Sequence, residues 1–140
     1  MGRILAIDYG RKRTGLAVTD PLQIIASPLL TVPSAKLEEY LSGYIENEKV
    51  DAIVVGYPRK MNNKPSEAVK YIDPFIKRIK KLFPDMPVYF EDERLTSVIS
   101  RKTILEGGVK KKERMDKSLA DKISASLILQ SFLEKRKIEI

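Results

Sequence analysis

The sequence predicts an α/β protein in which a mixed five-stranded sheet is flanked by helices. Short apolar runs typical of strands alternate with longer segments whose apolar residues recur at helical spacing. The first three apolar runs are joined by short turns, whereas the later ones are separated by helices. The first three strands can therefore pair as a meander, while the later ones need crossovers to parallel neighbours. The expected order is βββαβαβα, with one further helix before the last.

Five segments have the composition of strands. They are Ile4 to Ile7, Gly15 to Thr19, Ile24 to Val32, Ala52 to Gly56 and Val88 to Phe90. The first two follow each other across a turn and predict a hairpin. Pro28 interrupts the third, and the fourth is a continuous apolar run, which is typical of an interior strand buried on both faces.

Four segments have helical periodicity and are bounded by residues that favour helix ends. They run from Ser34 to Ile45, from Ser66 to Leu82, from Thr96 to Gly107 and from about Ser118 to Arg136. Ser34 is expected to cap the first. Within the second, Pro74 predicts either a kink or a later start.

The composition is that of one globular domain spanning residues 1–140, with 43% hydrophobic and 32% charged residues. Cysteine and histidine are absent, so carboxylates are the strong metal ligands left. The N-terminus has no signal pattern, and no apolar run approaches the ~20 residues of a membrane span. We therefore expect a cytoplasmic protein that does not associate with membranes.

A formal net charge of +7 favours an anionic partner, and nucleic acid is the leading candidate. Two basic clusters border acidic residues: Arg11, Lys12 and Arg13 follow Asp8, and a run that includes Lys110, Lys111 and Lys112 precedes Asp121. Lysine runs are usually solvated loops, but this placement favours phosphate binding. The few aromatic residues have core spacing, so base stacking is not expected. No separate apolar patch is evident either, which leaves a monomer or a weak dimer.

Acidic residues occur at the ends of two predicted strands and on the last helix. Asp8 ends the first strand, and Asp92 and Glu93 end the fifth. Parallel strands end at a common edge of a sheet, so these carboxylates should share that edge. Asp121 lies on the stripe of the last helix that faces the sheet. The small residues Ser124 and Ala125 on the same stripe should let the helix approach the sheet closely.

Each acid also has a structural explanation. Asp8 can accept hydrogen bonds within its turn, and Asp92 and Glu93 can stabilise the start of the next helix. Ser118 and Asp121 have the spacing of a capping box. Three carboxylates from separate elements nevertheless form a suitable site for Mg²⁺ or Mn²⁺. Two such ions ~4 Å apart would activate water and stabilise the departing oxygen of a phosphodiester.

These motifs together resemble those of the YqgF/RuvX proteins over nearly the whole chain. The shared segments are Asp8-Tyr9-Gly10 with Arg13, Gly15 and Asp20, then Val54 to Pro58, Asp92 to Ser97, and Asp121 leading into Ile128 to Gln130. Members of the family are described as Holliday junction resolvases and as nucleases that mature the 5′ end of pre-16S ribosomal RNA. Their fold is RNase H-like, so the resemblance implies that fold here.

The resemblance implies that Asp8, Glu93 and Asp121 are the catalytic, metal-binding acids. Arg13, Arg94 and Thr96 would support the site or contact phosphate, and Asp92 or Glu91 are alternative ligands to Glu93. The expected enzyme is a phosphodiester hydrolase that acts on an RNA end in ribosome maturation. Two alternatives stay open, a resolvase of branched DNA and a nucleic-acid-binding module without activity. An actin-like or sugar-kinase ATPase is disfavoured, because no phosphate loop or second lobe is apparent.

Overall fold

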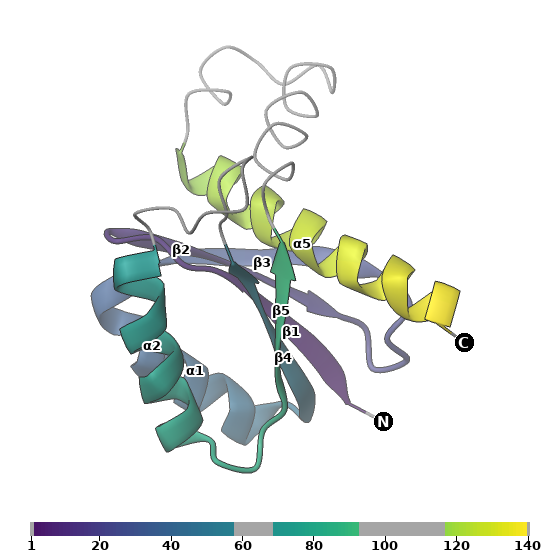
Figure 1. Cartoon of the computed structure of the whole chain (residues 1–140), viewed down its shortest axis with the longest axis horizontal. Helices are drawn as coiled ribbons and strands as arrows, with labels where there is room; N and C mark the ends of the chain where they lie inside the picture. The colour runs from purple at the N-terminus through teal and green to yellow at the C-terminus, as the bar shows by residue number, and fades with distance from the viewer. Residues whose placement is uncertain (1, 58–68, 93–116, 140) are drawn as a thin grey trace.

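The computed structural model describes residues 2–57, 69–92 and 117–139 (Figure 1). The elements are β1 (Arg3–Asp8), β2 (Arg13–Thr19), β3 (Ala26–Pro33), a 3₁₀ turn η1 (Ser34–Lys36), α1 (Leu37–Asn47), β4 (Val50–Tyr57), α2 (Val69–Leu82), β5 (Val88–Asp92) and α5 (Lys117–Glu139). The predicted order of strands and helices is confirmed for these residues. The helix expected from Thr96 to Gly107 lies outside them. None of the helices in the described part of the chain is long and apolar enough to cross a membrane.

The five strands form one mixed sheet in the order β3-β2-β1-β4-β5. β1, β2 and β3 pair antiparallel as a meander, and β1, β4 and β5 pair in parallel. Parallel pairing requires crossovers, and the chain supplies one through α1 and another that includes α2. The carboxyl ends of β1, β4 and β5 consequently lie at one edge of the sheet.

Helices cover both faces of the sheet, with α1 and α2 on one face and α5 on the other (Figure 1). Successive side chains of a strand point to opposite faces, and β1 shows this alternation. Leu5 and Ile7 are buried against α1 and α2, whereas Ile4 and Ala6 are buried against α5. The interior strands β1 and β4 are therefore apolar on both sides, as the sequence predicted for β4.

Ser34 does not cap α1, so that prediction is wrong. The residue before α1 is Lys36, which makes no side-chain capping bond, and Ser34 begins η1 instead. The Ser34 hydroxyl donates to the carbonyl oxygen of Gly10 and lies 2.8 Å from the hydroxyl of Thr14. These contacts tie the end of β3 to the turn after β1.

Two prolines lie inside regular elements. α2 continues through Pro74, so a later start of this helix is excluded. Pro28 lies in β3, where the register with β2 shifts between Leu16 and Ala17. β3 is an edge strand, and edge strands tolerate proline because their outer amides need no partner.

Candidate active site

Asp8 is the last residue of β1, and the two residues that follow it contact other elements of the fold. The Tyr9 ring stacks on Phe75 of α2, with the ring centroids 4.3 Å apart. At Gly10 a Cβ atom would lie 2.3 Å from the carbonyl oxygen of Arg13, so the turn is too tight for any other residue. Because the Ser34 hydroxyl also binds Gly10, the position of the chain next to Asp8 is fixed by three separate elements.

α5 approaches the sheet closely at Gly15, which faces Asp8 across the β1–β2 pair. A Cβ atom at Gly15 would lie only 2.0 Å from the carbonyl oxygen of Asp121. A glycine is therefore needed where the two backbones meet. Asp8 and Asp121, separated by most of the sequence, consequently flank the same glycine.

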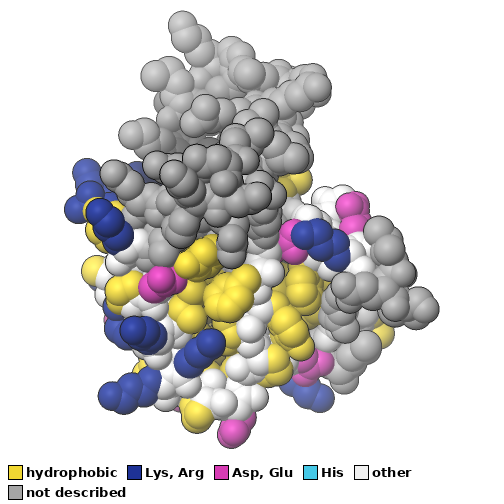
Figure 2. Space-filling model, in the orientation of Figure 1, with side chains coloured by type: hydrophobic (Ala, Val, Ile, Leu, Met, Phe, Trp, Pro, Cys, Tyr) yellow, Lys and Arg dark blue, Asp and Glu magenta, His cyan; other side chains and the backbone are white. Residues whose placement is uncertain are grey.

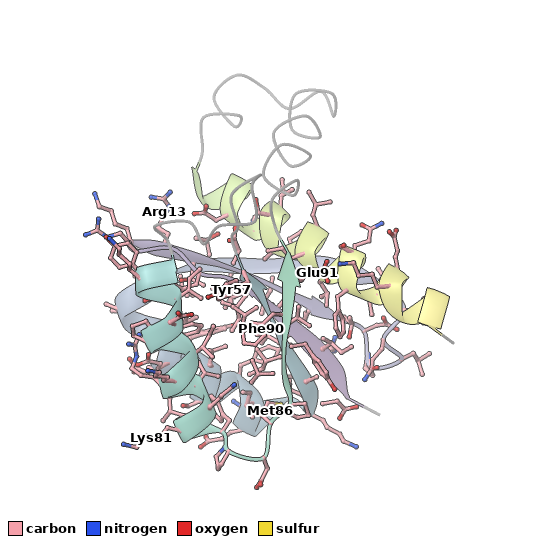
Figure 3. The ribbon with its side chains drawn as sticks, viewed as in Figure 1. Arg13, Tyr57, Lys81, Met86, Phe90 and Glu91 are labelled. Carbon is pink, nitrogen blue, oxygen red and sulfur yellow. The ribbon has the colours of Figure 1, made fainter. Side chains whose placement is uncertain are left out.

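The carboxylate of Asp121 accepts a hydrogen bond from the guanidinium of Arg13, with 2.9 Å between Nε and Oδ2. Arg13 is labelled in Figure 3. The two side chains are 38% and 27% exposed, so the ion pair lies at the surface of the site and is partly screened by water. Ser118 already lies within α5, which excludes it as the N-cap of a capping box with Asp121. Arg13 instead orients Asp121 toward β2.

Glu91 does not join these two carboxylates. It is 3% exposed, and its carboxylate accepts hydrogen bonds from Ser131 and Lys135 on α5. Ser131 follows Asp121 by ten residues, about 15 Å along the helix axis. Glu91 thus holds β5 against the part of α5 around Ser131 and Lys135. The prediction that Glu91 could replace Glu93 as a metal ligand is therefore not supported.

Several predicted site residues lie outside the described part of the chain. They are Glu93, Arg94, Thr96, Lys110, Lys111 and Lys112. Asp92 is described only as the last residue of β5, where it pairs with Tyr57. Among residues 2–57, 69–92 and 117–139, no cluster of three acidic side chains suited to a metal ion is found. Of the three predicted acids, the structure describes Asp8 and Asp121, whose backbones both lie next to Gly15.

The three basic residues after Asp8 differ in their exposure and in their contacts. Arg11 and Lys12 are exposed, and the Arg11 guanidinium lies 4.5 Å from the centroid of the Tyr71 ring on α2. Arg13 is engaged by Asp121. All three are close in sequence to Asp8, so the turn that follows this residue is positively charged.

Asp20 has a structural function in the β2–β3 turn. Its Oδ1 atom accepts hydrogen bonds from the backbone N–H groups of Ile24 and Ile25, both at 2.8 Å. These bonds, that from Ile25 first, hold the pKa of Asp20 below its ordinary value. Asp20 is therefore explained without any part in the site.

A hollow beside β5 was not predicted from the sequence. Its volume is about 690 Å³, and its lining is Tyr57, Asp73, Ile76, Lys77, Lys80, Phe90 and Lys135. Tyr89 and Phe90 are 47% and 49% exposed, so the expectation that aromatic residues belong to the core is wrong at β5. Figure 2 shows apolar side chains over this region with basic side chains on the α2 side. The sequence of β5 carries no signal of this exposure, which depends on the place of the strand in the sheet.

The arrangement of the strands and helices is that of the RNase H-like fold. A structure of T. thermophilus RuvC in complex with a Holliday junction substrate aligns with a TM-score of 0.54 and 17% identity, covering 98% of this chain and 97% of that one. A second structure of Thermus thermophilus RuvC aligns with a TM-score of 0.51 over 96% of each chain. These likenesses confirm the predicted fold class.

The chain belongs to the RuvX family, because the family model described as "RuvX: Holliday junction resolvase" matches residues 2–135. A protein of Parabacteroides distasonis is 55% identical over 140 residues, which cover all of both chains. One from Bacteroides fragilis is 53% identical over 138 residues, or 99% of this chain and 100% of the relative. Both relatives bear the name "Putative pre-16S rRNA nuclease". These matches place the chain among the nucleases, which hydrolyse phosphodiester bonds.

Proposed function

We propose that the protein trims the 5′ end of precursor 16S ribosomal RNA in the cytoplasm, with Asp8, Glu93 and Asp121 as catalytic acids. The observation that carries the proposal is the approach of α5 to the sheet at Gly15, where Asp8 and Asp121 flank one glycine. Glu93 directly follows β5, whose carboxyl end lies at the same edge as that of β1. The curated relatives named for this RNA cover the whole chain and support this substrate.

The donor set at this edge suits a divalent cation. Asp8 and Asp121 offer only oxygen atoms, which Mg²⁺ and Mn²⁺ prefer, and the chain has no histidine or cysteine. Mg²⁺ or Mn²⁺ held by Asp8, Glu93 and Asp121 would supply an activated water and positive charge against the phosphate. A carboxylate has about four lone-pair sites on its two oxygens, so Asp121 can accept from Arg13 and still bind a cation.

The residues of the chain itself would bind and orient the substrate. Arg13 holds the Asp121 carboxylate in place, and Tyr9 on Phe75 fixes the chain next to Asp8. Arg11 and Lys12 add positive charge where a phosphate would approach, as would Arg94, Thr96 and Lys110 to Lys112 by their sequence positions. Contacts of this kind recognise a backbone without reading its bases.

Cleavage of a pre-16S 5′ leader by the Asp8→Asn protein tests this function. The substitution keeps the size of the side chain but removes its charge, so cleavage should be abolished while the thermal unfolding curve stays close to that of the wild type. Glu46→Gln is the matched control, because Glu46 is an exposed carboxylate on α1, and its cleavage rate should be unchanged. Activity of the wild type in excess EDTA, or of Asp8→Asn, would contradict the proposed site.

A second candidate function is the resolution of four-way DNA junctions, which the description of the family favours. Resolution requires paired cuts on opposing strands, and these usually demand two sites in a dimer. The same assay should therefore include a mobile four-way junction. Symmetric nicks in the junction without trimming of the leader would reverse the assignment, and binding of both without cleavage would indicate a non-catalytic module.

A further inference from the structure

We propose that β5 and the adjoining lysine-bearing side of α2 form a binding surface for a single-stranded stretch of the RNA substrate. This surface is separate from the acidic residues around Gly15. The proposal rests on the proposed function for the identity of the RNA. It concerns residues that no part of that function uses: Tyr57, Lys77, Lys80, Tyr89 and Phe90.

β5 lies at the edge of the sheet and carries an exposed aromatic ring on each face of the sheet. It is the last strand in the sheet order, and no described residue pairs with its outer edge. Tyr89 and Phe90 are adjacent, so their side chains point to opposite faces, and each is about half exposed. One ring therefore faces solvent on either side of the same strand.

Each of these rings rests against a second aromatic ring. Tyr89 lies 5.4 Å from Phe132 of α5, and Phe90 lies 5.7 Å from Tyr57 in an edge-to-face arrangement, measured between ring centroids. The supporting rings fix the orientation of Tyr89 and Phe90. A fixed aromatic face with its other side open to water is the usual stacking platform for an unpaired base.

The charge around Phe90 is positive. Lys77 and Lys80 of α2 line the hollow, and the Lys80 ammonium lies 5.8 Å from the centroid of the Phe90 ring. Asp73, the one acid among the described lining residues, accepts a hydrogen bond from the Tyr57 hydroxyl at 3.0 Å. Neither Lys77 nor Lys80 forms an ion pair with the residues that the structure describes. Their charge is therefore available to a polyanion.

The hollow reaches the carboxyl end of β4, because Tyr57 is one of its lining residues. Tyr57 is the last residue of β4, and Phe90 lies about 7 Å before the end of β5 at the usual rise of a strand. Figure 3 labels Tyr57 on β4 and Phe90 on the neighbouring strand β5. A nucleic-acid strand that crosses the carboxyl ends of the strands can therefore continue over the hollow.

This chemistry fits single-stranded RNA better than other occupants of an exposed edge. A peptide that added to β5 as a strand would bind through backbone groups and would need no lysines. A second copy of this chain would bring like charges from both α2 helices together. A duplex keeps its bases stacked internally, so the two aromatic rings would find no partner.

Binding of a labelled single-stranded RNA from the pre-16S leader, measured by fluorescence anisotropy in EDTA, tests the proposal. Phe90→Leu keeps an apolar side chain but removes the ring, and it should weaken binding about 5-fold or more if one stacked base is lost. Lys80→Gln should lower the slope of log affinity against log salt by about 0.7, the value for one phosphate of a single strand. The same RNA annealed to its complement should lose less affinity on the Phe90→Leu change.

Two matched controls accompany these variants. Leu82→Ala removes an apolar side chain from α2 that is 48% exposed and does not line the hollow, and Lys49→Gln removes an exposed lysine at the opposite end of β4. Both should bind the single strand like the wild type. Equal affinity of Phe90→Leu and Lys80→Gln with the wild type would overturn the proposal, as would a concentration-dependent dimer of the wild type that Phe90→Leu dissociates.

Binding in EDTA does not depend on cleavage, so the two proposals can fail separately. An inactive protein whose RNA affinity still falls with Phe90→Leu would overturn the proposed function alone. An active protein whose RNA affinity is unchanged by both Phe90→Leu and Lys80→Gln would overturn this surface alone.

Discussion

Gly15 lies between the backbones of Asp8 and Asp121, the two described acids of the candidate site. Pairing with β1 sets it opposite Asp8, and the carbonyl oxygen of Asp121 occupies the space that a side chain would need. The position of α5 against β2 therefore depends on the absence of a side chain at Gly15. Gly43 in α1 provides a comparison, because nothing lies within 4 Å of a Cβ atom there.

We expect Gly15→Ala to destabilise the protein by about 1–3 kcal/mol, because the backbone of α5 must move to admit the new atom. Cleavage should fall as well, since Asp121 moves with the helix. Gly43→Ala should instead stabilise the protein by about 0.5–1 kcal/mol, as glycine is unfavourable inside a helix. Urea denaturation measures both effects. A Gly15→Ala protein as stable and as active as the wild type would show that the close approach is not needed.

At the scale of elements, α2 connects the core to the site. Its apolar face buries Ile72, Phe75 and Ile79 against the sheet, and Phe75 also stacks on Tyr9, the residue after Asp8. A neighbouring side of the same helix carries Lys77 and Lys80, which line the hollow next to β5. One helix thus stabilises the fold, holds the turn at Asp8 and contributes charge beside the hollow.

Phe75→Leu separates the packing role of α2 from its role at the site. Loss of the stacked pair should cost about 0.5–1.5 kcal/mol beyond the loss of buried area, and cleavage should fall because Tyr9 is no longer held. Ile79→Val is the control, since it shortens a buried side chain of the same helix at a cost of about 0.5–1.5 kcal/mol. Calorimetry and the cleavage assay should show both variants destabilised but only Phe75→Leu impaired in kcat. If Ile79→Val lost as much activity, general destabilisation would explain both.

At the scale of the whole molecule, the formal charge of +7 sets a long-range attraction for nucleic acid. The described basic residues Arg11, Lys12 and Arg13 follow Asp8, and Lys77 and Lys80 lie beside β5. Basic residues thus occur near both proposed binding regions. RNA affinity should consequently depend steeply on salt.

Replacement of Lys110, Lys111 and Lys112 by alanine tests the contribution of the basic run before Asp121. If each lysine neutralises one phosphate of a single strand, the slope of log affinity against log salt should fall by about 2. Titrations from low to physiological salt, with Lys49→Gln as the reference for a remote lysine, provide the measurement. Unchanged slope and affinity would identify the run as a solvated loop.

The sequence by itself determined the order of elements and the positions of the two described acids on them. Alternation in the strands and helical spacing in the helices are local patterns, so β1 ending at Asp8 and a last helix carrying Asp121 were predictable. The motifs also sufficed to indicate the family. Antiparallel pairing of the first strands followed from their short connections, which leave few other arrangements.

Only the tertiary structure decided which of these residues meet and which surfaces stay open. The pairing of Glu91 with Lys135, the contact of Ser34 with Gly10 and the exposure of Phe90 all join segments distant in sequence. An apolar residue in a strand has the same local pattern whether the strand lies inside the sheet or at its edge. The order β3-β2-β1-β4-β5 leaves β5 at the edge, and so two aromatic residues typical of a core face solvent beside lysines.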